Sequence, residues 1–127
     1  MELFLLALSA VLCLALALPY ATGLTLERGL PVMAGNREGF VEPTGWKGRA
    51  KRAHMNMVEN LVPFAALILT AVVAQKLGPL TALGAQLFFW GRVAHAVSYI
   101  AGIPYVRTLG YLVAVIGMVL IFVAIIR

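Results

Sequence analysis

The chain has 127 residues, of which 62% are hydrophobic and only 12% are charged. A domain of this size could not bury so much apolar surface in water, so the composition excludes a soluble globular protein and indicates an integral membrane protein. The formal net charge of +5 is not accompanied by any known basic and aromatic nucleic-acid-binding motif, and we therefore expect no nucleic-acid partner.

Four apolar runs divide the chain, and each is long enough, or nearly so, to cross a hydrocarbon core of ~30 Å as a helix. They lie at about residues 3–21, 55–73, 80–103 and 109–126. The strict alternation of apolar and polar residues that a transmembrane β-barrel requires is absent. The sequence predicts an all-α integral membrane protein, a four-transmembrane-helix bundle in one domain over residues 1–127. The helices are expected at about residues 3–28, 47–76, 80–102 and 106–126.

The first apolar run is compatible with a secretory signal peptide or with a retained helix. Glu2 stands where a signal peptide needs positive charge, and the run is long for such a peptide, which favours a retained helix. Cys13 is the only cysteine, so no internal disulfide is possible. We expect it to be a small lipid-facing or helix-facing side chain rather than a reactive thiol.

Lys and Arg are divided unevenly between the two sides of such a bundle. Six of the ten lie in or beside the first connection, and Arg107, near the start of the fourth helix, is on the same side. The opposite side has only Lys76 and Arg127. The positive-inside rule therefore predicts that the first and third connections are cytoplasmic and that both termini lie on the opposite side. We expect this to be a bacterial inner membrane, with membrane lipids, including anionic headgroups, as neighbours of the basic loop.

The connections and one proline add local expectations. Gly and Pro residues punctuate the first connection, at about residues 30–47, and predict an irregular loop with Trp46 at the membrane interface. Within the second long helix, Pro63 predicts a kink just past Glu59. The second and third connections are short, which makes consecutive helices antiparallel neighbours.

Two polar stripes lie within the apolar helices. On the second helix Arg52, Asn56 and Glu59 are spaced i, i+4 and i+7, with Arg49 close beside them. The third helix carries its own stripe, which is Arg92, His95 and Tyr99. Glu59 and Arg92 fall at similar depths and could pair, either as an ion pair that fixes helix register or as part of a polar cavity.

The polar side chains of the predicted cytoplasmic half come from all four helices. They are Arg28, Arg49, Arg52, Asn56, Glu59, Arg92, His95, Tyr99, Arg107 and Tyr111. An excess of guanidinium groups suits a small ligand that carries carboxylates, which arginine binds bidentately, and the same positive field favours a thiolate over a thiol. No second His or Cys completes a metal set around His95, so we expect no metal.

Two segments resemble signatures of the MAPEG family, the membrane-associated proteins in eicosanoid and glutathione metabolism. The first is RAKRAHMNMVENLVPF at residues 49–64; the second is GRVAHAVSY at residues 91–99, followed by Arg107, Thr108 and Tyr111. The length, the four spans and the basic first loop are also similar. The resemblance implies a homotrimer whose glutathione sites lie between adjacent subunits and open to the cytoplasm.

The resemblance also implies residue roles. The implied glutathione contacts are Arg28, Arg52, Asn56, Glu59, Arg92, His95, Tyr99, Thr108 and Tyr111. Arg107 resembles the arginine held near the thiol, which implies a catalytic role in favouring the nucleophilic thiolate. Met55 stands where the prostaglandin E synthase branch has a basic residue, so that branch's substrate is not implied.

The expected function is that of a glutathione-dependent membrane enzyme, a microsomal-type glutathione transferase or peroxidase that acts on lipophilic electrophiles arriving from the bilayer. Isomerase chemistry also remains open. The alternative is a non-catalytic MAPEG-like membrane protein with a structural or partner-binding role. An ion or proton pathway through Glu59 and His95 is disfavoured, because the outer half of the fourth helix is wholly apolar.

Overall fold

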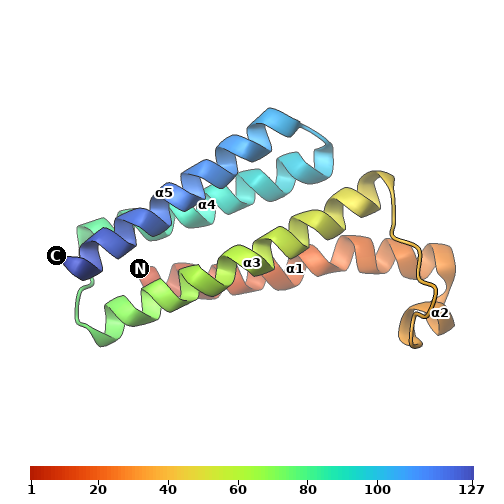
Figure 1. The fold of residues 1–127 in the computed structure, drawn as a ribbon, viewed down its shortest axis with the longest axis horizontal. Helices are drawn as coiled ribbons and strands as arrows, with labels where there is room; N and C mark the ends of the chain where they lie inside the picture. Colours follow the sequence, from red (N-terminus) through yellow and green to blue (C-terminus); the bar gives the residue numbers. More distant parts are fainter.

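The computed structural model describes all residues from 1 to 127, and every regular element in it is a helix. The elements are α1 (Glu2–Arg28), α2 (Leu30–Ala34), α3 (Gly45–Val73), α4 (Pro79–Ala101) and α5 (Pro104–Ile126). The long helices run antiparallel along one another, so both termini lie at one end of the molecule and α2 lies at the other (Figure 1). The predicted all-α class is confirmed.

The first connection differs from the expected irregular loop, because residues Leu30–Ala34 form the short helix α2. Gly29 separates it from α1 at φ 88°, in the left-handed region that glycine enters without a Cβ penalty. Pro31 lies in the first turn of α2, where a missing backbone N–H leaves no hydrogen bond unmade. The expectation of an irregular loop is therefore wrong for these residues and holds for residues 35–44.

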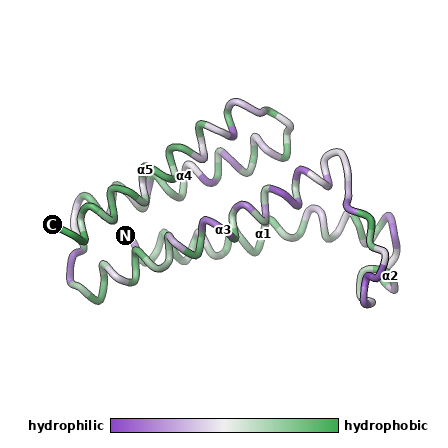
Figure 2. The backbone as a smooth tube through the Cα atoms, viewed as in Figure 1, coloured by the Kyte–Doolittle hydropathy of each residue, from purple (hydrophilic) through white to green (hydrophobic).

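The helices differ in how well they suit a membrane. Three of them, α1, α3 and α5, are long and apolar enough to cross one. The helix α4 has 23 residues, as many as α5, but Gln86, Arg92 and His95 lower its hydropathy. Figure 2 shows hydrophilic segments around α2 and along the part of α3 nearest to it, with mostly apolar sequence in the half of the bundle that carries the termini.

Glycines bring α4 and α5 into backbone contact. A Cβ built on Gly91 of α4 would lie 2.7 Å from the carbonyl oxygen of Gly110 on α5, and one built on Gly84 would lie 2.5 Å from that of Gly117. All four glycines are buried. Small residues of this kind let membrane helices approach closely, where lipid offers no hydrophobic drive for association. The two helices therefore form a tightly packed antiparallel unit, called the α4–α5 pair below.

The helices α1 and α3 form a second unit, the α1–α3 pair. The Tyr20 hydroxyl and the His54 Nδ1 lie 3.1 Å apart, within hydrogen-bonding distance across the two helices. The Trp46 ring packs against Gly23, where a Cβ would lie 2.8 Å from the ring. Trp46 at the start of α3 is thus held against the end of α1.

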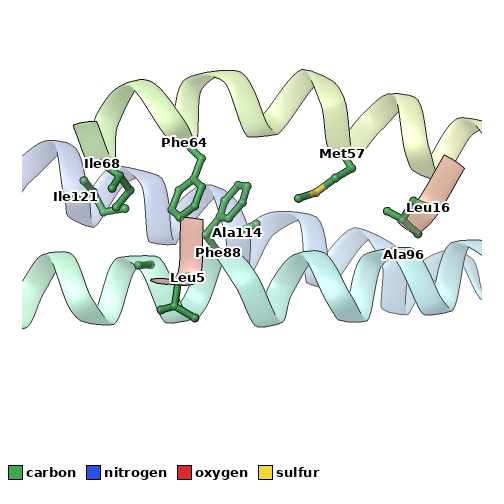
Figure 3. Close-up of a cluster of buried hydrophobic side chains, with 10 residues drawn as sticks. Leu5, Leu16, Met57, Phe64, Ile68, Phe88, Ala96, Ala114 and Ile121 are labelled. Atoms are coloured by element: carbon green, nitrogen blue, oxygen red, sulfur yellow. The ribbon is translucent and has the colours of Figure 1, made fainter. Parts of the chain in front are cut away.

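Apolar packing joins the two pairs through the middle of the bundle. Phe64 of α3 and Phe88 of α4 are fully buried, and their rings stack with centroids 3.8 Å apart and an interplanar angle of 9°. Figure 3 shows these rings side by side, with Ile68 and Ile121 packed together along the same seam. This stack fixes the position of α4 along α3.

One side-chain hydrogen bond joins the pairs at each end of the molecule. At the end with the termini, the Thr81 hydroxyl donates to Oε1 of Glu2 at 2.7 Å, and both residues are buried. At the other end, the Arg49 Nε donates to the Ile100 carbonyl oxygen at 3.1 Å. The sequence does not identify the partners in either bond, because each bond joins helices that are distant in the chain.

Thr81→Val is expected to lower the free energy of unfolding by ~1–3 kcal/mol, because the buried Glu2 carboxylate loses its hydroxyl donor. The variant also removes the acceptor of the Gly78 N–H. Unfolding of the purified protein in detergent measures the change. Thr70→Val is the matched control, since the exposed Thr70 hydroxyl bonds only the Ala66 carbonyl within its own helix. Equal losses in the two variants would contradict a specific contribution of the Glu2–Thr81 bond.

Candidate functional site

A polar pocket of about 240 Å³ lies between α3, α4 and α5. Its lining residues are Asn56 on α3, His95 and Tyr99 on α4, and Arg107, Thr108 and Tyr111 on α5. They come from the first half of α3, the last turns of α4 and the first turns of α5, all in the half of the molecule that carries α2. Every one of them belongs to the set that sequence analysis singled out.

Tyr99 is the centre of this pocket, because two arginines from different helices converge on its ring. The Arg107 guanidinium carbon lies 4.4 Å from the ring centroid, and that of Arg52 lies 5.9 Å from it. Both distances are within the range of cation–π attraction. The His95 ring meets Tyr99 edge-on, at 5.4 Å between centroids. No carboxylate lines the pocket, so its local charge is positive.

Buried polar groups without partners lie at the base of this site. Arg92 and His95 are only 1% and 4% exposed. None of the three guanidinium nitrogens of Arg92 has a hydrogen-bond partner in the chain, and neither does the Nδ1 of His95. Buried polar groups in folded proteins are nearly always paired, and an unpaired buried cation is strongly unfavourable. A single chain therefore leaves the hydrogen-bonding needs of these two side chains unmet.

Glu59 and Arg92 do not form the ion pair that their similar depths made possible. Glu59 is exposed on α3, whereas Arg92 is buried. The ion pairs that do form are those of Glu2 with the amino terminus, Glu27 with Lys47 and Glu42 with Lys51. Similar depth along two helices was the basis of the expectation, and depth does not fix which way a side chain faces.

Arg28 lies apart from the pocket, at the end of α1. Its Nη1 donates to the Val41 carbonyl oxygen at 2.6 Å, and its guanidinium carbon lies 4.8 Å from the Phe40 ring centroid. Arg37 and Lys51 also lie over this ring, at 5.9 Å and 5.3 Å. The predicted site residues therefore do not all meet in one place. Six line the pocket, Arg92 is buried, Arg52 and Glu59 are exposed on α3, and Arg28 lies at the end of α1.

The sequence placed Arg49 beside the polar stripe and among the side chains of a candidate anion site, but did not predict a contact with α4. The structure shows it bonded to the end of α4. Its partner is a backbone carbonyl, and the pattern of side chains in a sequence does not predict such a contact. The one available signal is Pro104, which has no N–H to donate to the Ile100 carbonyl four residues earlier.

Comparison with known proteins gives one match. The family model described as "MAPEG family" matches residues 1–127, which is the whole chain. No curated protein matches the chain, and no solved structure does.

Proposed function

The chain belongs to the MAPEG family over its whole length, and on this basis we propose that it is a glutathione-dependent membrane enzyme. The proposed activity is that of a microsomal-type glutathione transferase or peroxidase acting on lipophilic electrophiles from the bilayer. The observation that carries the proposal is that Arg52 and Arg107 both lie over the Tyr99 ring, and that Arg107 and Tyr99 line a pocket together with Asn56 and His95.

The chemistry of the pocket suits this tripeptide. Glutathione has two carboxylates, one amine and a thiol, and planar guanidinium groups bind carboxylates bidentately. In the proposed reaction, the thiol loses its proton to water and Arg107 stabilises the thiolate that forms. The sulfur then bonds to an electrophilic carbon of the substrate, and the leaving group departs with its electron pair. Asn56, His95, Tyr99, Thr108 and Tyr111 hold the peptide.

A homotrimer with glutathione between adjacent subunits accounts for the residues outside the pocket. The pocket of one chain lies between three helices and is open to the surface, whereas Arg28 and the exposed Glu59 lie outside its lining. In the proposed assembly they join the site across the interface, where Glu59 binds the ammonium group of glutathione.

The proposed arrangement in the membrane has four spans, with α4 crossing alongside α5. The basic first connection and the α4–α5 connection lie in the cytoplasm of a bacterium, and both termini lie on the other side of its inner membrane. The pocket then opens toward the cytoplasm, where glutathione is dissolved, while the electrophile reaches it from the lipid.

Titration of the detergent-purified protein with glutathione tests the proposal. Calorimetry measures binding, ultraviolet difference absorbance measures thiolate, and S-methylglutathione is the matched ligand, since it keeps both carboxylates and the amine but has no ionisable thiol. We expect saturable binding of both ligands, with a thiolate signal at neutral pH for glutathione alone. Binding without that signal would favour the alternative, a non-catalytic family member. A folded oligomer that binds neither ligand would contradict the glutathione assignment.

A further inference from the structure

The end of α4 next to the pocket depends on a side chain from another helix. A helix leaves its last four carbonyl groups without partners inside the helix. For Ile100 the usual donor would be the N–H of residue 104, but residue 104 is proline and has none. The α4 helix also has no basic residue in its own last turn. Its C-terminal end therefore needs a donor and a positive charge from outside.

Arg49 of α3 supplies both. Its Nε donates to the Ile100 carbonyl oxygen at 3.1 Å, across 51 residues of sequence. A cation at this position also stabilises the negative end of the helix dipole. The guanidinium packs against Gly102, where a Cβ would lie 3.4 Å from Nε. Gly102 has φ 82°, and its N–H and that of Ile103 bond back to Tyr99 and Ser98.

The turn that Arg49 contacts, at Gly102 and Ile103, joins the pocket residues of α4 to those of α5. Tyr99 lies in the last turn of α4 and Arg107 lies in the first turns of α5, so the turn at Gly102 decides how Arg107 sits over the Tyr99 ring. The same hydrogen bond ties this turn to α3, which carries Asn56 on the facing wall. At this end of the molecule it is the only side-chain hydrogen bond between the α1–α3 pair and the α4–α5 pair.

We propose that Arg49 is a positioning residue, which caps α4 from α3 and thereby holds Arg107 in place over Tyr99. Arg49 does not line the pocket, so its effect on chemistry passes through the turn at Gly102. The significance of this role for catalysis rests on the proposed function. The capping itself needs no ligand, so the two can be tested separately.

Hydrogen exchange tests the capping without glutathione. In Arg49→Met, the Gly102 and Ile103 amides are expected to exchange roughly tenfold faster than in the unmodified protein, because the uncapped turn opens more often. Lys51→Met is the matched control: it removes a cation two residues along the same helix whose contacts are Glu42 and Phe40 rather than α4, and exchange at Gly102 should stay unchanged. Unchanged exchange in Arg49→Met would overturn the proposal.

A second measurement separates positioning from ligand contact. With glutathione bound, Arg49→Met is expected to lose most of the thiolate absorbance while its affinity changes less than about threefold, a small effect on the scale of a lost ligand contact. A large loss of affinity with normal exchange at Gly102 would make Arg49 a ligand contact and overturn the proposal. If no variant binds glutathione, the proposed function fails, and the exchange result still decides the capping role.

Arg49→Lys covers the case in which Arg49→Met does not fold. Lysine keeps the charge near the end of α4 but loses the planar group that reaches the Ile100 carbonyl. Its Gly102 and Ile103 amides are expected to exchange faster than in the unmodified protein, and more slowly than in any folded Arg49→Met. Exchange equal to that of the unmodified protein would mean that charge alone suffices, which contradicts a cap made by the hydrogen bond.

Discussion

Arg107→Ala is expected to lower kcat for glutathione conjugation by about 10²–10³-fold, the usual effect of removing one group that stabilises developing or ionised charge in an active site. In the structure Arg107 is the guanidinium closest to Tyr99 and lines the pocket. Without it the thiol would keep its proton at neutral pH. The rate is measured with an activated aryl chloride, and the thiolate is measured by ultraviolet absorbance in the same samples.

Two variants make this result interpretable. Arg37→Ala removes an exposed arginine that contacts Phe40, outside the pocket, and should leave the rate unchanged. Arg107→Lys restores the charge as a point charge without the planar group and should recover part of the thiolate signal. A folded Arg107→Ala that conjugates at the normal rate would rule out a catalytic role for this residue.

Gly91→Ile is expected to have the largest effect on stability of any change considered, exceeding the ~1–3 kcal/mol typical of overpacked cores. A Cβ at this position would lie 2.7 Å from the Gly110 carbonyl oxygen and 2.9 Å from the Ala114 backbone nitrogen. Both are backbone atoms, so no rotamer change relieves the clash and α5 must move away from α4. We expect little folded protein to survive purification in detergent, as measured by elution as a single species and by thermal unfolding.

Gly78→Ile is the matched control for this change. A Cβ at Gly78 meets no atom within 4 Å, and the residue has φ −176°, which is ordinary extended backbone. Its unfolding midpoint should stay near that of the unmodified protein. Gly91→Ala gives a graded test, since even one methyl group clashes with α5. If Gly91→Ala unfolds at the same temperature as the unmodified chain, then the close contact of α4 and α5 does not hold the bundle together.

The helices could be predicted from the sequence because the apolar runs, with Gly and Pro between them, determine their number and approximate extent. The helix α2 could not, since five residues show no periodicity. The contacts of Gly84 with Gly117 and of Gly91 with Gly110 could not be predicted either. A glycine in an apolar helix is compatible with close packing, but the sequence alone does not say which glycine on another helix it meets.

The pocket was predictable in part for a geometric reason. Spacing places His95 and Tyr99 on one face of α4, and the short turn that follows brings Arg107 back beside them. The pairing of Glu59 with Arg92 failed, because spacing fixes directions only relative to the axis of the same helix. Which face of α3 turns toward α4 is decided by packing between the helices, such as the stack of Phe64 on Phe88.

The close packing of the α4–α5 pair affects how the chain enters a bilayer during synthesis. An arginine at the centre of a lone helix costs ~2.5–3.5 kcal/mol on insertion scales. The helix α4 carries the buried Arg92 and lacks the membrane-length apolar stretch that the other long helices contain. The strongly apolar α5 follows after a turn of only two residues, Gly102 and Ile103. We therefore expect the translocation machinery to release α4 and α5 into lipid together as a helical hairpin, after α5 has been synthesised.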